Sequence, residues 1–285
     1  MEKILSRVIL TLLSLTVIVV ASEIVTITFG VYQSDKATVM YRKFTPILEI
    51  LEEKVEAQLN VPVSFELRIF KDYDEANDAI TNGEVDFVRF GPASYIIAKK
   101  RNNYIKLLVM EERKGKKRFK GVVVVKSESP YTSLKDLKGT DFAFGASKST
   151  IGRYLIQAEL VKAGLTGGDF KSYNYLDRHD KVFKAVEIGD YHAGSVKETT
   201  YKRYNKGDSL RILFSFENVT KPWIARAGLA DETFTAIQET LLSLEEDTAT
   251  LKELKVTGFL PTSDSEYEYV RKSMELVSQF SDDPF

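Results

Sequence analysis

Two consecutive hydroxyl residues, Ser149 and Thr150, follow a run that is typical of a short buried strand. The run Phe142–Gly145 alternates aromatic and small residues, and the residues after Thr150 have the apolar spacing of a helix. A hydroxyl at a helix start accepts hydrogen bonds from backbone N–H groups that have no other partner. These N–H groups and the positive end of the helix dipole also suit an anion. A capped helix without a ligand is the alternative that this pattern leaves open.

A second turn of the same kind lies earlier in the chain, at Phe90–Tyr95 (Phe-Gly-Pro-Ala-Ser-Tyr). In open α/β sheets, ligands bind beyond the carboxyl ends of the strands. Two such turns facing each other across a cleft would clamp a ligand, although two ordinary strand-to-helix turns remain the alternative. Tyr73 begins a helix after another strand, where it either contacts a ligand or is simply half-buried.

His179 stands at the start of a further predicted helix, where an imidazole can donate a hydrogen bond to an anion. A helix-capping or surface histidine is the alternative. Ser149, His179 and an aspartate could form a catalytic triad. However, Ser149 lies at a cap and not in a Gly-x-Ser-x-Gly turn, so we expect a binding protein and no enzyme.

The composition excludes several classes of function. The chain has 285 residues, a net charge of −1, no cysteine and two histidines. The length suits two ordinary domains or one large domain, and the near-zero charge gives no support for nucleic-acid binding. Without cysteine there is no disulfide framework and no cysteine-ligated metal, so we expect neither a metal nor a cofactor.

The N-terminus has the pattern of an export signal. Lys3 and Arg7 precede the uncharged run Val8–Ala21, which ends in small residues. The run is shorter than the ~20 residues of a membrane span. We therefore predict a signal peptide over residues 1–21, a mature chain that starts near Ser22, and an exported, periplasmic protein. An uncleaved membrane anchor is the alternative.

Strand and helix patterns alternate along the mature chain, which predicts an α/β fold. Residues 24–110 show the order βαβαβαβ, typical of a parallel sheet with crossover helices. The charged stretch 111–120 is predicted as a loop or crossing ribbon, and a second βα series follows it. Strands at 210–216 and 223–228 are expected to return to the first domain. The predicted division is therefore 23–116 and 212–285 for lobe 1, and 117–211 for lobe 2.

Three segments in order, residues 85–95, 148–155 and 178–186, together resemble a known family. The chain is similar to the phosphate, phosphite and phosphonate substrate-binding proteins of ABC transporters, which are called PhnD-like. The resemblance covers nearly all of the mature chain. It implies a type II periplasmic-binding-protein fold, in which two α/β lobes joined by two crossings hold an oxyanion between them. It also implies a membrane permease as partner, and we expect a monomer.

The resemblance assigns the site residues by motif. Hydroxyls, backbone N–H groups and an imidazole would bind the ligand oxygens, with one tyrosine in the cleft. The residues that match are Ser149, Thr150, Ile151, Gly152, His179 and Tyr73.

The chain also departs from the family pattern. A third hydroxyl is often found where this chain has Ile151. A cleft tyrosine at the end of the third strand is replaced by Phe90, although Tyr95 lies one helical turn further on.

Binders of aminoalkylphosphonates use acidic residues for the ligand amine. An ungapped alignment puts Lys221 and Thr199 at those two places, with Glu198 adjacent. An amine would then face a like charge, which is unfavourable when both are desolvated. We therefore expect a compact anion such as phosphate, phosphite or a simple alkylphosphonate.

The sequence thus predicts an exported solute-binding protein that closes on a small phosphorus oxyanion and delivers it to a permease. A sensory receptor that presents the bound anion to a membrane signalling partner would have the same fold and site. A secreted hydrolase using Ser149 and His179 is the weaker alternative.

Overall fold

The structure is a computed structural model that describes residues 23–34, 36–244 and 249–281. The signal peptide predicted over residues 1–21 lies outside the described residues. Among the helices that the structure describes, none is long and apolar enough to cross a membrane.

The first lobe is built on a six-stranded sheet with the order β11-β4-β10-β3-β1-β2. Its strands are β1 (Val25–Tyr32), β2 (Val63–Phe70), β3 (Phe87–Arg89), β4 (Lys106–Glu112), β10 (Pro222–Ala225) and β11 (Gly258–Leu260). β1 pairs in parallel with β2 and β3, whereas β10 lies antiparallel between β3 and β4. β4 therefore runs in the same direction as β3, as predicted, but it does not pair with a parallel strand, because the returning strand β10 occupies the place beside β3.

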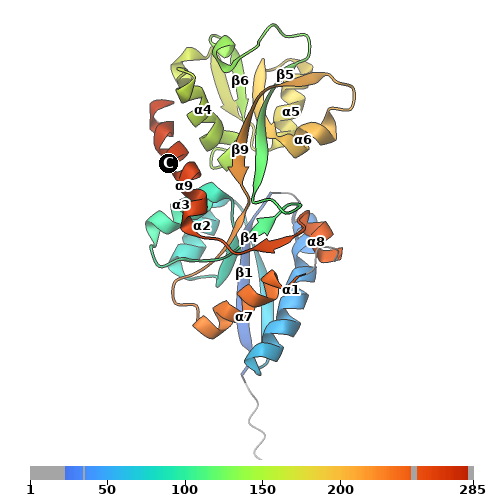
Figure 1. Cartoon of the computed structure of the whole chain (residues 1–285), viewed down its shortest axis with the longest axis vertical. Helices are drawn as coiled ribbons and strands as arrows, with labels where there is room; N and C mark the ends of the chain where they lie inside the picture. The colour runs from blue at the N-terminus through green and yellow to red at the C-terminus, as the bar shows by residue number, and fades with distance from the viewer. Residues whose placement is uncertain (1–22, 35, 245–248, 282–285) are drawn as a thin grey trace, which may run out of the picture.

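Helices cover both faces of this sheet (Figure 1). They are α1 (Ala37–Leu59), α2 (Tyr73–Asn82), α3 (Pro92–Arg101), α7 (Asp231–Leu242) and α8 (Ala249–Leu254). α1, α7 and α8 share one apolar cluster with the sheet, while α2 and α3 belong to another. α1 buries Phe44, Ile47 and Leu51 completely, at the spacing expected of an amphipathic helix.

The second lobe is built on a five-stranded sheet with the order β7-β6-β8-β5-β9. Its strands are β5 (Arg118–Lys126), β6 (Asp141–Phe144), β7 (Ser172–Tyr175), β8 (Ala193–Lys197) and β9 (Leu210–Val219). Its helices and helical turns are η1 (Leu134–Leu137), η2 (Thr150–Leu155), α4 (Ile156–Lys162), η3 (Gly167–Asp169), α5 (His179–Ile188) and α6 (Glu198–Tyr204). The four valines 122–125 of β5 are fully buried, as expected of a strand covered on both faces.

The chain crosses between the lobes at 113–117 and again at 220–221. β9 pairs with β5 along its whole length, so it belongs to the second sheet. The predicted return to lobe 1 at residue 212 is therefore too early. The apolar pattern of residues 210–216 marks a strand, but it does not reveal which sheet that strand joins.

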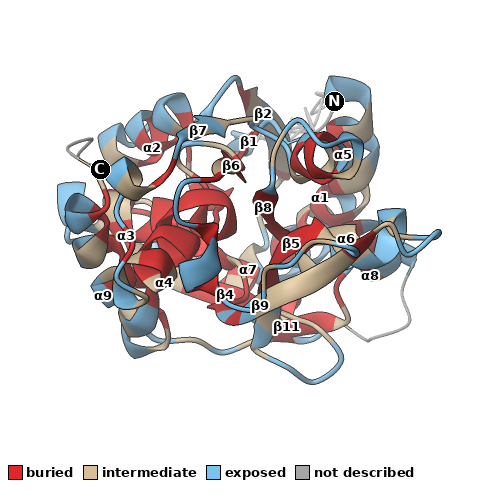
Figure 2. Cartoon of the chain, turned by 90° about the horizontal axis from the view of Figure 1, so that it is seen from above, coloured by how far each residue is buried: buried red, intermediate tan, exposed pale blue. Residues whose placement is uncertain are grey.

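The C-terminal segment contacts both lobes (Figure 1). It comprises η4 (Asp264–Tyr267), α9 (Glu268–Leu276) and η5 (Val277–Gln279). α9 packs against α3 and α4, and the Phe280 ring contacts Phe144 and Phe170. The end of the segment predicted as lobe 1 thus packs on the second lobe. In Figure 2, buried residues lie between the elements and exposed residues on their outer faces.

Candidate anion-binding site

Ser149 caps the helix that begins at Thr150, as the sequence predicts. Its Oγ accepts a hydrogen bond from the Gly152 N–H at 3.0 Å. Gly152 in turn lies directly against the end of β6, because the Gly145 N–H donates to its carbonyl at 2.9 Å. A Cβ at 152 would lie 2.7 Å from the Gly145 Cα. Gly152 therefore permits a close backbone contact, and its N–H is already used by the cap.

Thr150 connects the two predicted turns. Its Oγ1 accepts a hydrogen bond from the Ala93 N–H at 3.1 Å, and Ala93 lies in the first turn of α3. Thr150 belongs to the second lobe and Ala93 to the first, so the two turns face each other. Since Oγ1 is the acceptor in this bond, the hydroxyl proton of Thr150 remains free to be donated to an anion.

Two stacked tyrosines adjoin the hydroxyl pair. The rings of Tyr32 and Tyr73 lie 4.0 Å apart, and the Tyr73 hydroxyl is hydrogen-bonded to the Ser149 side chain. Burial raises the pKa of both phenols, so both hydroxyls stay protonated. Tyr73 is thus placed at the predicted site. Sequence reasoning did not identify Tyr32, although it ends β1 at the carboxyl edge of the sheet.

His179 is the first residue of α5 and lies beside Gly145. Burial, with Lys197 as the next cause, lowers its pKa to about 3, against a hydrogen bond with the Ser195 backbone that raises it. The ring is therefore neutral at neutral pH. Among the described residues, its buried Nδ1 has no hydrogen-bond partner, so this atom is left for a ligand.

Lys221 lies at the second crossing, next to the tyrosine pair. Its Nζ donates to the Tyr32 hydroxyl at 3.3 Å and lies 5.4 Å from the centre of that ring. Burial, then Arg89 and Lys197, lower its pKa well below the ordinary lysine value.

Four other residues that were predicted to bind the ligand make contacts within the protein. The Tyr95 hydroxyl donates to Asp264 at 2.7 Å, so it points toward the C-terminal segment. Phe90 is fully buried, with its ring 5.9 Å from that of Tyr32. The remaining two are also engaged: the Ile151 carbonyl accepts the Ser195 hydroxyl, and Glu198 forms an ion pair within α6 with Lys202 at 2.9 Å.

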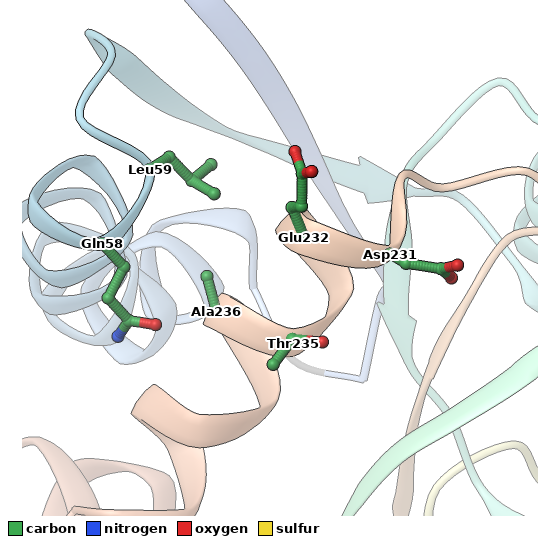
Figure 3. Close-up of a pocket in the computed structure, with 6 residues that line it drawn as sticks. All are labelled: Gln58, Leu59, Asp231, Glu232, Thr235 and Ala236. Carbon is green, nitrogen blue, oxygen red and sulfur yellow. The ribbon is translucent and has the colours of Figure 1, made fainter.

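A surface hollow lies elsewhere, between the end of α1 and the start of α7 (Figure 3). Two carboxylates, those of Asp231 and Glu232, line it, which makes it unsuitable for an anion. Across the ranges that the structure describes, no cluster of three histidine or acidic side chains could hold a metal ion.

The two sheets with their flanking helices define a type II periplasmic-binding-protein fold. The chain belongs to the family described as "ABC transporter, phosphonate, periplasmic substrate-binding protein", whose sequence profile matches residues 29–267. Members of this family are the substrate-binding components of transporters, not enzymes. The expectation of a binding protein is therefore confirmed, and the hydrolase alternative is excluded.

Two relatives illustrate the likeness. "Probable ABC transporter phosphite binding protein PhnD1" of Prochlorococcus marinus (strain MIT 9301) is 28% identical over 214 residues, which cover 69% of this chain and 71% of the relative. The solved structure of PhnD1 from the same organism, in complex with methylphosphonate, has a TM-score of 0.73 and 21% identity. That match covers 89% of this chain and 98% of PhnD1.

A third protein has a similar fold. XAC2383 from Xanthomonas citri, in a structure bound to a chloride ion, has a TM-score of 0.77 and 19% identity. The match covers 90% of this chain and 99% of XAC2383.

Proposed function

We propose that the protein captures a compact phosphorus oxyanion, a phosphonate, phosphite or phosphate, at the contact between its two lobes. The observation that carries this proposal is the placement of Thr150. Its Oγ1 accepts the Ala93 N–H of the opposite lobe, which leaves its proton for the ligand. The neighbouring N–H groups of Thr150 and Ile151 lie at a helix start, where anions are favoured.

The remaining groups suit the same ligand. The buried Nδ1 of His179 needs a partner, and an anion beside Tyr32 would raise the lowered pKa of Lys221 and favour its charged form. A neutral imidazole whose other nitrogen is hydrogen-bonded to Ser195 presents a lone pair at Nδ1. His179 Nδ1 would therefore accept a hydrogen bond from a protonated ligand oxygen, rather than donate one as the resemblance implied.

Physiologically, the protein would act outside the cytoplasm after cleavage of the 1–21 signal and would work as a monomer. Ligand binding would close the lobes by rotation about the two crossings, and the closed form would dock on an ABC permease. The family profile and the names of the relatives, one a phosphite binder and one holding methylphosphonate, support this assignment.

A thermal-shift panel tests the proposal, with phosphate, phosphite, methylphosphonate, aminoethylphosphonate and sulfate as probes. At 100 times its Kd, the preferred anion stabilises the native state by ~2.7 kcal/mol. For a protein of this size, this corresponds to a rise in Tm of roughly 2–4 °C per kcal/mol. We expect a phosphorus oxyanion without an amine to give the largest shift. A flat response to all phosphorus compounds would overturn the proposal.

If aminoethylphosphonate gave the largest shift, the general function would stand, but the exclusion of an amine would fall. Among the described residues, Glu198 is the acid adjacent to the predicted place, and its pairing with Lys202 at 2.9 Å supports the expectation that no amine is bound. Calorimetry with the two best probes then gives the affinities directly.

A further inference from the structure

The Tyr32 hydroxyl lies beside the start of α3, next to the contact between the two lobes. A Cβ on Gly91 would lie 3.1 Å from the Tyr32 hydroxyl oxygen and 3.3 Å from Thr150 Oγ1. The two hydroxyl groups therefore flank the same glycine, one from each lobe. The φ of Gly91 is −76°, which any residue adopts, so glycine is needed here for space and not for its backbone conformation.

Two hydrogen bonds link Ser149 to Tyr32 through Tyr73. The rings of Tyr32 and Tyr73 are stacked 4.0 Å apart, and their hydroxyls are hydrogen-bonded to each other. Burial raises the pKa of both phenols most, and their mutual bond then raises that of Tyr73 and lowers that of Tyr32, as expected when Tyr73 donates. The bond with Ser149 lowers the pKa of Tyr73, so Ser149 donates to it. The Tyr73 hydroxyl thus has a donor and an acceptor within the protein.

The Tyr32 oxygen, in contrast, is surrounded by donors. The Gly91 N–H and the Tyr73 hydroxyl donate to it, and Lys221 Nζ donates to it at 3.3 Å. A phenol oxygen has two lone pairs, so its capacity to accept is used up and its own proton is what it can still donate. In the part of the chain that the structure describes, no carbonyl or carboxylate oxygen accepts this proton.

Lys221 could take the Tyr32 proton only as a neutral amine. Burial lowers the pKa of Lys221 well below the ordinary lysine value, and a neutral amine has a lone pair. An anion beside Tyr32 favours the ammonium form, which has no lone pair and can only donate. With an anion bound, the Tyr32 proton therefore has the anion itself as its acceptor.

We propose that Tyr32 binds the ligand directly, donating its hydroxyl proton to one oxygen of the phosphorus group while Thr150 donates to another. Tyr73 is then a positioning residue, because its hydroxyl holds the Tyr32 oxygen and has no proton left for the ligand. This inference rests on the proposed function and specifies the ligand further. Since both hydroxyls beside Gly91 are donors, the ligand presents two unprotonated oxygens there, as phosphite and methylphosphonate can.

Isothermal titration calorimetry at neutral pH tests the proposal, with phosphate, phosphite and methylphosphonate as probes. Tyr32→Phe keeps the stacked ring and removes the hydroxyl. The loss of one charge-assisted hydrogen bond should raise the Kd of each probe that the unmodified protein binds by about 10- to 150-fold. Tyr73→Phe removes a neutral hydrogen bond behind the site and should raise the Kd by about fivefold or less. Tyr104→Phe, at a position that is 78% exposed, is the matched control and should leave the Kd unchanged.

A second variant keeps both tyrosines. Gly91→Ala puts a Cβ 3.1 Å from the Tyr32 oxygen, so that oxygen must move by a few tenths of an ångström. The Kd of the same probes should therefore rise by about threefold or more. Gly207→Ala, whose Cβ has no atom within 4 Å, is the control for this substitution. Circular dichroism without ligand establishes that each variant is folded, and Gly91→Ala decides the question if Tyr32→Phe is not.

A folded Tyr32→Phe protein that binds the probes with unchanged affinity would overturn the proposal and leave the proposed function intact. A larger loss of affinity in Tyr73→Phe than in Tyr32→Phe would also overturn it, because Tyr73 would then be the donor to the ligand. If the unmodified protein binds none of the three probes, the proposed function fails together with this inference.

Discussion

Replacing Thr150 by valine tests how the closed form is stabilised. Valine keeps the shape of threonine but cannot accept the Ala93 N–H, which Thr150 Oγ1 now accepts at 3.1 Å. Ala93 is fully buried and Thr150 is 7% exposed. The Ala93 N–H would therefore stay buried without a partner in the closed form, whereas it would be hydrated in an open form. An unsatisfied buried donor costs ~1–3 kcal/mol. Because ~1.4 kcal/mol corresponds to a factor of ten, the apparent Kd should rise about 5- to 150-fold.

Calorimetry with methylphosphonate measures this loss of affinity, and small-angle X-ray scattering measures the fraction of closed molecules at saturation. Thr150→Ser keeps the hydroxyl and should stay within about threefold of the unmodified protein. Thr26→Val, at an exposed position of β1, should change neither quantity. If Thr150→Val bound methylphosphonate with unchanged affinity, the hydroxyl would contribute neither to the ligand nor to the contact between the lobes.

Three further predictions concern stability. Glu111→Gln removes the carboxylate that pairs with buried Arg89 and should lower the free energy of unfolding in urea by about 3–5 kcal/mol. Gly152→Ala puts a Cβ 2.7 Å from the Gly145 Cα and should destabilise the protein by about 1–3 kcal/mol in the same assay. The pKa of His179 is lowered from 6.5 to about 3, so the unfolded chain binds a proton that the native state does not. Stability should therefore fall by up to ~1.4 kcal/mol per pH unit as the pH drops from about 6.5 to 3, and less steeply in His179→Gln.

Matched variants control the first two of these measurements. Glu253→Gln changes an exposed glutamate, and Gly207→Ala adds a Cβ with no atom within 4 Å. Both should keep the unfolding free energy within about 0.5 kcal/mol. A Glu111→Gln protein of unchanged stability would mean that Arg89 does not need its counter-charge. A Gly152→Ala protein as stable as Gly207→Ala would show that the contact between the Gly152 and Gly145 backbones is loose. If stability fell equally steeply with falling pH in the unmodified protein and in His179→Gln, His179 would be ruled out as the source of that fall.

The sequence predicts the capped helix start at Ser149 and Thr150 because the signals for it are local. Ser149 and Thr150 follow a strand and precede a helix, and the Gly91-Pro92 turn repeats that arrangement. A cap is defined within four residues, so Ser149 could be identified without any knowledge of the tertiary fold. The carboxyl-end rule then places both turns at facing sheet edges.

The parts that the sequence misses depend on contacts between distant segments. Tyr95 lies one helical turn after Phe90, yet its hydroxyl donates a hydrogen bond to Asp264, which is 169 residues away in the chain. In the same way, the sheet that β9 joins is set by its register with β5 and not by its own residues.

The groups proposed to bind the anion come from both lobes, so binding and closure would be coupled. Thr150 and its neighbours would supply directional hydrogen bonds, which select the shape of a phosphorus group. Besides burial, Lys197 in the second lobe and Lys221 at the second crossing both lower the pKa of His179, so closing an empty cleft would bring like charges together. An anion would offset this repulsion, and its charge would therefore favour the closed form. Affinity and closure would then have a common physical origin, because the charge that binds the ligand also draws the two lobes together.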